Sequence, residues 1–213
     1  HDGIRDQPRS RGLGYVYKRQ ILLLLIAGLG ISGERFYSLI MSSTNTKEFF
    51  DDVIKSLDND GIDNTIELCN NTPGPVAEIF HAGLSRFHRG LREVEKAVQD
   101  AGGLEMSFLE KNMIWMNAVI TIAPMLGFTG TVAGMVNAFD AIAAANDISP
   151  AVVAGGISQA LLTTAFGLIV AMIIQIFQNF FVSMIDKLIL DMEENSVKFM
   201  DQLHLEYEKL AQS

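Results

Sequence analysis

Threonine hydroxyls inside apolar runs are the groups in this sequence whose type and spacing could do chemistry. Thr131 lies in one such run, and Thr163 and Thr164 lie in a second, where Gln159 precedes Thr163 by about one helical turn. A hydroxyl in an apolar medium needs a hydrogen-bond partner. It can bond to a carbonyl of its own helix, which only assists packing, or it can line a narrow hydrated path for an ion. The spacing favours packing and leaves the ion path open.

The two apolar runs contain no titratable side chain. Asp, Glu, Lys, Arg and His are absent from 112–139 and from 148–185. Proton transfer through a membrane generally uses a titratable group near mid-depth. If this chain conducts protons, we therefore expect a carboxyl group from a different chain to carry them.

Small residues recur near these threonines at the three- and four-residue spacing of one helix face. They are Gly127, Gly130 and Gly134 in the first run, and Gly156, Ala160 and Gly167 in the second, where Thr164 stands between the last two. A face without large side chains lets the backbone of another helix approach closely. In the first run Pro124 also removes one helical hydrogen bond, and we expect neighbouring helices or a nearby hydroxyl such as that of Thr121 to satisfy the freed carbonyl.

The elements that carry these residues are predicted to cross a membrane. Hydrophobic residues make up 49% of the 213 residues and charged residues only 19%, and the mean hydropathy is +0.25, which is too apolar for a typical soluble domain. About 20 apolar residues span the hydrocarbon core of a bilayer. We predict an all-α integral membrane protein with three transmembrane helices over 16–40, 113–139 and 151–182. Glu34 and Arg35 are predicted to form an interfacial anchor pair near the end of the first.

Charged helical segments are predicted to connect and extend these spans. They are a cytoplasmic helical loop over 42–112, in which a turn at 70–75 separates two amphipathic helices, a short link over 140–150, and a helical tail over 183–213 that continues the third span. Basic residues favour the cytoplasmic side of a membrane. The loop has seven of them, the tail three and the link none. We therefore place the loop and the C-terminal tail in the cytoplasm, and the link and, by parity, the N-terminus in the periplasm.

Residues 1–20 fit this arrangement poorly. They are polar, begin without Met, and contain five basic residues that disagree with a periplasmic position. We interpret the segment as a truncated or non-native beginning.

Several other functions are disfavoured by the composition and the spacing. The net charge of -9 disfavours nucleic-acid binding, which uses a basic face. His81 and His88 share a helix face, but without a third ligand nearby they do not predict a metal site. The single cysteine, Cys69, is expected to be an inert thiol in a reducing compartment. The soluble loop shows no nucleophile and base pair and no phosphate-binding motif, so we predict no enzyme, no catalytic residue and no cofactor.

Two long motifs in the apolar runs resemble those of a known family. The stretch Ala-Pro-Met-Leu-Gly-Phe-Thr-Gly-Thr-Val at 123–132 is similar to the Ala-Pro-Leu-Leu-Gly-Leu-Leu-Gly-Thr-Val core of the ExbB/TolQ/MotA proton-channel proteins, and 156–168 is similar to their third-helix motif. Glu34 and Arg35 match the close of their first helix, and 109–111 with Trp115 match the start of the second. The resemblance covers about residues 21–200.

The resemblance implies a subunit of a bacterial inner-membrane motor. Family members form a homo-oligomeric ring of five subunits around the membrane helices of an ExbD/TolR-like single-span partner, whose aspartate carries the proton. They pass energy to a TonB- or TolA-like protein for biopolymer transport or Tol-Pal function. Thr131 and Thr164 match the pore-facing threonines of the family, with Thr163 and Gln159 beside them. Many ExbB/TolQ members have Glu at the position of Gln159, and Gln cannot titrate. The three spans favour the ExbB/TolQ branch over the MotA branch.

The sequence leaves two alternatives open. The first is a non-conducting membrane scaffold whose threonines only pack, and the second is a sodium-driven member of the same family. The choice between ExbB-like and TolQ-like partners is also open.

Overall fold

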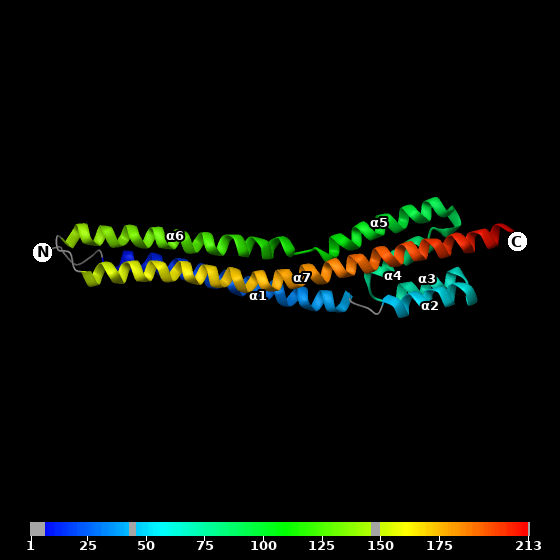
Figure 1. Cartoon of the computed structure of the whole chain (residues 1–213), viewed down its shortest axis with the longest axis horizontal. Coiled ribbons are helices and arrows are strands. Elements are labelled where there is room, and N and C mark those ends of the chain that lie inside the picture. Colours follow the sequence, from blue (N-terminus) through cyan, green and yellow to red (C-terminus); the bar gives the residue numbers. More distant parts are fainter. Residues whose placement is uncertain (1–6, 43–45, 146–149, 213) are drawn as a thin grey trace. The chain divides into compact units, whose positions relative to one another are not determined.

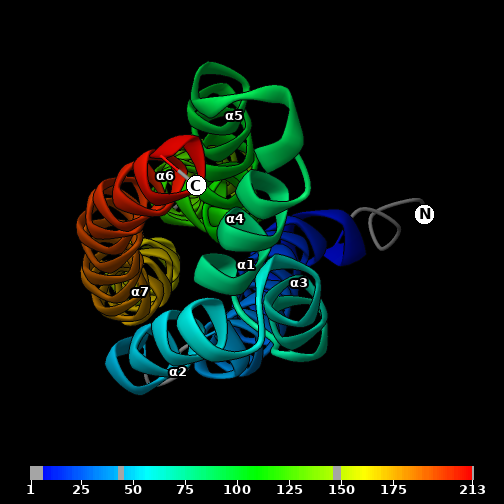
Figure 2. The same cartoon turned by 90° about the vertical axis from the view of Figure 1, so that its right-hand side faces the viewer.

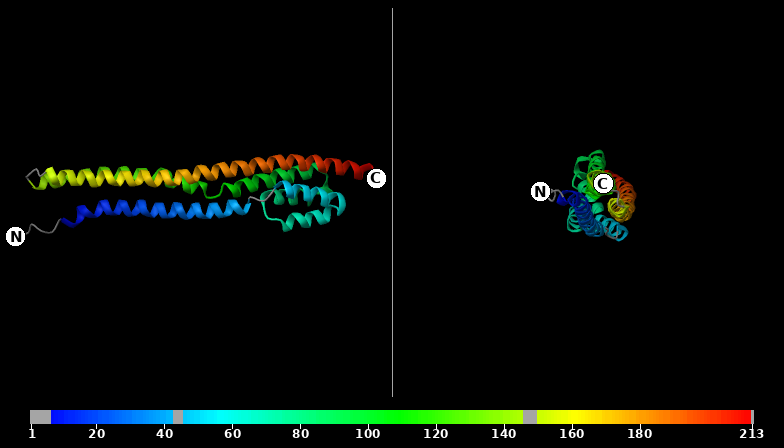
Figure 3. Two further views of the ribbon diagram at one scale, coloured as in Figure 1. Left: turned by 60° about the horizontal axis from the view of Figure 1, so that its bottom comes forward. Right: turned by 90° about the vertical axis from the view of Figure 1, so that its left-hand side faces the viewer.

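Every regular element in the part of the chain that the structure describes is a helix. The computed structural model describes residues 7–42, 46–145 and 150–212. The elements are α1 (Gln7–Ser42), α2 (Thr46–Asn59), α3 (Ile62–Asn71), α4 (Pro75–Leu84), the short 3-10 helix η1 (Phe87–Arg89), α5 (Leu91–Leu109), α6 (Met113–Ala145) and α7 (Pro150–Gln212) (Figure 1). Figure 3 shows the same helices from two further sides.

The contacts divide the chain into two units. The first, here called the apolar unit, contains the residues up to Glu34 and Asn112–Phe180. The second, the loop unit, contains Arg35–Lys111 and the residues from Phe181 onward. The helices α1 and α7 therefore contribute residues to both units.

Three helices, α1, α6 and α7, contain stretches that are long and apolar enough to cross a membrane. Their outward side chains are exposed over most of their length, as for Leu23 on α1, Phe128 on α6 and Ile176 on α7. Exposed apolar surface of this extent is unfavourable in water. The apolar unit therefore requires lipid or other protein chains around it.

The observed helix ends differ from the predicted ones. The helix α1 begins at Gln7, so it includes most of the segment that the sequence set aside as 1–20, while residues 1–6 lie outside the described part. Pro8 does not prevent this, because proline is tolerated in a first helical turn. The helix α6 continues to Ala145 through an alanine-rich end, since alanine is the strongest helix former. Of the predicted link over 140–150, residues 146–149 lie outside the described residues.

The helix α7 runs through the predicted boundary between the third span and the tail. It is one helix from Pro150 to Gln212, as the continuing helical pattern predicted. Its polar end packs in the loop unit through Phe199 and Leu203, both fully buried.

The loop unit is built around α4. Ile79, Phe80 and Leu84 are 1%, 0% and 0% exposed, and the ring of Phe80 stacks on that of Phe199 with 4.1 Å between centroids. Gly83 makes this approach possible, because a Cβ atom there would lie 2.9 Å from Val98 Cγ2 and 3.0 Å from Phe199 Cε1. Within this unit α5 lies on one side of α4, and α2 and α3 lie on the other (Figure 2).

The two amphipathic helices predicted for the loop are each divided into two. Gly61 separates α2 from α3 with φ +82°, and Gly90 precedes α5 with φ +98°. Glycine adopts this left-handed backbone without steric cost. The sequence prediction was incomplete here, because it relied on apolar periodicity and did not use these two glycines as breaks.

Cys69 lies in the core of the loop unit. It is 2% exposed, and burial raises the pKa of its thiol from 9.0 to about 12. The thiol is therefore neutral at pH 7, which confirms the expectation of an inert thiol, since the thiolate is the reactive form. The reducing compartment stays a prediction.

Candidate functional site between α6 and α7

The small residues of α6 and α7 lie where the two helix backbones approach most closely. A Cβ atom on Gly127 would lie 3.0 Å from Thr164 Cα, and one on Gly167 would lie 2.5 Å from the carbonyl oxygen of Ala123. The atoms that block these positions belong to backbone, which cannot move aside like a flexible side chain. Only glycine therefore permits this contact at both positions.

Further pairs along the same two helices continue the contact. Cβ atoms on Gly130 and Gly134 would lie 2.7 Å from Thr163 Cγ2 and from Ala160 Cβ, respectively. A Cβ atom on Gly156 would lie 2.8 Å from Ala138 Cβ. All six small residues singled out in the sequence thus lie at the contact between α6 and α7.

Thr131 and Thr164 meet across this contact. Their Oγ1 atoms are within hydrogen-bonding distance of each other, and both side chains are half-buried. The Thr164 hydroxyl also donates to the carbonyl of Gly127, at 2.9 Å. The Thr131 hydroxyl lies 3.2 Å from the same carbonyl and 3.4 Å from that of Ala160.

The partners of this hydroxyl pair limit what it can offer to a third group. Each threonine has one hydroxyl proton and two lone pairs. Carbonyl oxygens and the other hydroxyl are available to take both protons. Only lone pairs of the two hydroxyl oxygens are then left for a third group. The two threonines therefore accept a hydrogen bond from it better than they donate one. A protonated carboxyl group, a water molecule or a small cation suits such a site, whereas a carboxylate suits it less.

The other two side chains predicted for the ion-path wall do not join the pair. Thr163 is 1% exposed, faces Gly130, and donates to the carbonyl of Gln159 at 3.2 Å. The side chain of Gln159 is exposed. Thr163 therefore takes part in helix packing, and the contribution of Gln159 to this contact is its main-chain carbonyl.

The proline in α6 is accommodated differently from the expectation. The hydroxyl of Thr121 donates to the carbonyl of Asn117, at 2.9 Å. Pro124 has no N–H to donate to the carbonyl of Ile120, four residues before it. Because the proton of Thr121 goes to Asn117, Thr121 does not satisfy the carbonyl of Ile120. The expected role of Thr121 was wrong.

Arg35 is not an exposed interfacial anchor. Its side chain is 2% exposed, and Nη1 donates to the carbonyl of Leu109 at 3.3 Å. Leu109 is the last residue of α5, where the carbonyls have no partner within the helix. Buried arginine satisfies such a carbonyl because it carries fixed, charged donors. For Arg35, the predicted role as an interfacial anchor is therefore corrected to capping of α5.

Glu34 is exposed, and its carboxylate has a partner in the apolar unit. Asn112 Nδ2 donates to Glu34 Oε2 at 3.2 Å. Asn112 has φ +66° just before α6 begins, a conformation that asparagine tolerates better than most residues. The sequence analysis did not identify Asn112 or Leu109. An asparagine between two helices is a weak signal, and nothing in the sequence pointed to the carbonyl of Leu109.

Replacing Arg35 by methionine is expected to destabilise the loop unit by about 1.5–3 kcal/mol, because the carbonyl at the end of α5 loses a charged donor. The midpoint of thermal unfolding of the full chain in detergent, and the rate of proteolysis within 42–112, measure this effect. Arg19→Met is the matched control, because Arg19 lies on the same helix and is exposed. Equal effects of the two substitutions would contradict the capping role.

The described residues do not meet the requirements of a metal-binding site. No group of three His, Cys, Asp or Glu side chains in residues 7–42, 46–145 and 150–212 could hold a metal ion.

Comparison with known proteins identifies the class to which this fold and helix contact belong. The model of the MotA/TolQ/ExbB proton channel family matches residues 71–194, which is more than half of the chain. The chain belongs to this family. Its all-α membrane fold, predicted from the sequence, is confirmed.

Individual relatives agree with the ExbB/TolQ branch. An ExbB biopolymer transport homologue of Methanothermobacter thermautotrophicus is 31% identical over 172 residues, covering 78% of this chain and 61% of its own. The TolQ protein of the Tol-Pal system of Pseudomonas aeruginosa is 34% identical over 45% of this chain and 46% of its own. The biopolymer transport protein ExbB of Salmonella typhimurium is 40% identical over 32% of this chain and 28% of its own. The chain thus spans less than two thirds of the length of these relatives.

Proposed function

We propose that this chain is the multi-pass subunit of an ion-driven, energy-transducing complex in a bacterial inner membrane. The observation that carries the proposal is the half-buried hydroxyl pair of Thr131 and Thr164, located where two apolar helices without titratable residues over 113–139 and 154–185 meet. Such a pair can take part in ion transfer only as a fixed wall. The titrating group then belongs to a partner.

The proposed partner is an ExbD/TolR-like single-span protein with an aspartate in its membrane helix. Copies of this chain form a ring, as a pentamer, around that helix, and a TonB- or TolA-like protein receives the energy. Membership of the family and the names of the relatives support an energy-transducing complex of this kind, and the pentameric ring is part of the proposal. The loop and the C-terminus lie in the cytoplasm, as the distribution of basic residues over 42–213 indicates. The N-terminus then lies in the periplasm, because three spans place the two ends of the chain on opposite sides of the membrane.

The hydroxyl pair acts on the protonated form of the partner's acid. A neutral carboxyl group crosses an apolar wall at lower cost than a carboxylate. When it reaches Thr131 and Thr164, its O–H donates to the lone pairs that the threonines leave available. Loss of the proton removes that donor, so the neutral and ionised acids favour different positions of the partner helix.

Ion flux in vesicles tests this function. The full chain is reconstituted with an ExbD/TolR-like single-span protein, with a pH-sensitive dye inside the vesicles. We expect proton entry down a pH gradient only when both proteins are present, and its loss when the partner's aspartate is changed to asparagine. A sodium gradient with a sodium-sensitive dye tests the sodium-driven alternative. Absence of both fluxes from an assembled complex would favour the non-conducting scaffold.

A further inference from the structure

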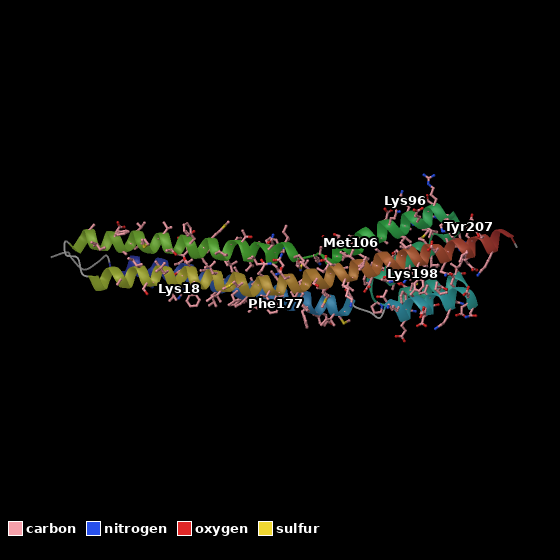
Figure 4. The ribbon with its side chains drawn as sticks, in the orientation of Figure 1. Lys18, Lys96, Met106, Phe177, Lys198 and Tyr207 are labelled. Carbon is pink, nitrogen blue, oxygen red and sulfur yellow. The ribbon has the colours of Figure 1, made fainter. Side chains whose placement is uncertain are left out.

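Opposite charges collect on two faces of the loop unit. Exposed cations on η1, α5 and the turn before η1 form a basic face, consisting of Arg86, Arg89, Arg92 and Lys96. Exposed acids on α2, α3 and the turn between them form an acidic face, consisting of Asp51, Asp60, Asp63 and Glu67. Lys96 lies on the side of α5 that is turned away from α7 (Figure 4).

Neither face is neutralised within its own chain. In the part of the chain that the structure describes, none of these eight side chains forms an ion pair. Two neighbouring acids do form ion pairs, but with cations outside the basic face: Asp52 with Lys55 at 3.5 Å and Asp58 with Lys209 at 3.6 Å. Near the basic face, the half-buried Glu93 and the exposed Glu95 and Asp100 form no ion pair with these cations, and near the acidic face the exposed Lys47 forms none with these acids. The two faces therefore keep opposite charges that are available to another molecule.

The helices that carry the two faces lie on opposite sides of α4 in the loop unit. The helix α4 packs against α5 on one side and against α3 on the other, and α2 packs on α3 (Figure 2). A closed ring of identical subunits uses a heterologous contact, in which two different faces of the same chain meet. Opposite charges on opposite sides are what such a contact needs, because contact between two identical faces would bring like charges together.

We propose that the basic face of one copy packs against the acidic face of the next copy around the ring. This inference depends on one part of the proposed function, namely that copies of this chain form a ring. Each exposed ion pair contributes little by itself. Several pairs together direct association and disfavour wrong pairings, because charge complementarity acts mainly on specificity and on the rate of encounter.

Cross-linking within the intact complex tests which faces meet. In a Cys69→Ser background, full-length copies with Gln99→Cys are co-expressed with differently tagged copies carrying Asn70→Cys. Both positions are exposed and uncharged, on α5 and α3 respectively. A short bifunctional maleimide should link unlike copies far more than like copies. Links between two Gln99→Cys copies that are as abundant as unlike links would overturn the proposal.

Charge reversal then tests the cause of the contact. Arg92→Glu with Lys96→Glu on the Gln99→Cys copy should lower the yield of unlike links about tenfold, which corresponds to about 1.4 kcal/mol. Asp63→Lys with Glu67→Lys on the Asn70→Cys copy should do the same. Combining both reversals should restore the yield to within about twofold of the original, because the charges are again complementary.

A matched control and a salt series complete the experiment. Lys187→Glu with Lys198→Glu reverses two exposed charges on α7 and should leave the yield unchanged. Raising the salt from about 0.1 M to about 1 M shortens the screening length from about 10 Å to about 3 Å, so the effect of each reversal should shrink. Failure of the combined reversal to restore the links would refute charge pairing between copies.

The mass of the complex separates failure of this inference from failure of the proposed function. If mass photometry finds no oligomer, the ring itself is wrong. If the ring is present and unlike links are absent, only the contact proposed here is wrong. If reversal of the basic face lowers binding of the full chain to vesicles of anionic phospholipid and leaves the links unchanged, that face binds lipid headgroups and the proposal fails.

Discussion

Ion flux through the complex is expected to fall about thirtyfold when Thr131 and Thr164 are both replaced by valine. Valine has nearly the shape of threonine but lacks the hydroxyl, so the helices still meet while the lone pairs disappear. A buried polar group that loses its partner costs about 1–3 kcal/mol, and each 1.4 kcal/mol is about tenfold, so the middle of that range corresponds to about thirtyfold. The measurement is the initial rate of proton entry into vesicles, at equal amounts of assembled complex.

Thr129→Val provides the matched control for this double variant. Thr129 is on the same helix, but its side chain is exposed and its hydroxyl donates to the carbonyl of Met125 at 2.8 Å. Its replacement removes a hydroxyl from α6 without touching the pair, and should leave the flux within about twofold, as a surface substitution does. Normal flux in the double valine variant would remove the polar wall from the proposed function and leave the threonines with a packing role alone.

Assembly of the apolar unit is expected to fail when Gly167 is replaced by alanine. The new Cβ atom would lie 2.5 Å from the carbonyl oxygen of Ala123 and 3.2 Å from Gly127 Cα. Both atoms belong to the backbone of α6, so α7 must move away along a length of the helix. Overpacking costs about 1–3 kcal/mol in soluble cores where side chains can adjust, and we expect at least the upper end of that range here.

The yield of folded protein in detergent and the midpoint of its thermal aggregation measure this effect. Gly155→Ala is the matched control, because Gly155 lies on the same helix and nothing lies within 4 Å of its added Cβ atom. This control should be neutral or slightly stabilising, since alanine favours helix more than glycine does. A Gly167→Ala protein as stable as the Gly155→Ala protein would show that α6 and α7 do not approach as closely as described.

The spans and the identity of the small residues were predictable, because they depend on local composition and spacing. A run without charges over 112–139 has the length to cross a membrane whatever its neighbours do. Gly127 and Gly167 were likewise recognised by their spacing with other small residues. What the spacing could not give was their register, that is, which atom of α7 faces each glycine of α6. Register is decided by the sum of contacts along both helices.

The role of Arg35 could not be predicted from its position beside an apolar run. A basic residue there is consistent with exposure at a membrane surface or with burial against a partner, and the sequence analysis chose exposure. Its burial depends on the end of α5, which lies 74 residues further along the chain. Similarly, Gly61 and Gly90 are visible in the sequence, but glycine interrupts a helix only where the packed structure requires a positive φ.

The sequence by itself determined that this chain is a helical membrane protein of the MotA/TolQ/ExbB type, with no acid or base in its second and third spans. Only the tertiary structure decided that Thr131 pairs with Thr164 while Thr163 is buried under Gly130. Neighbouring positions on a helix point about 100° apart. Which of two adjacent hydroxyls reaches the other helix therefore depends on the rotation and register of both helices, and these are properties of the packed structure.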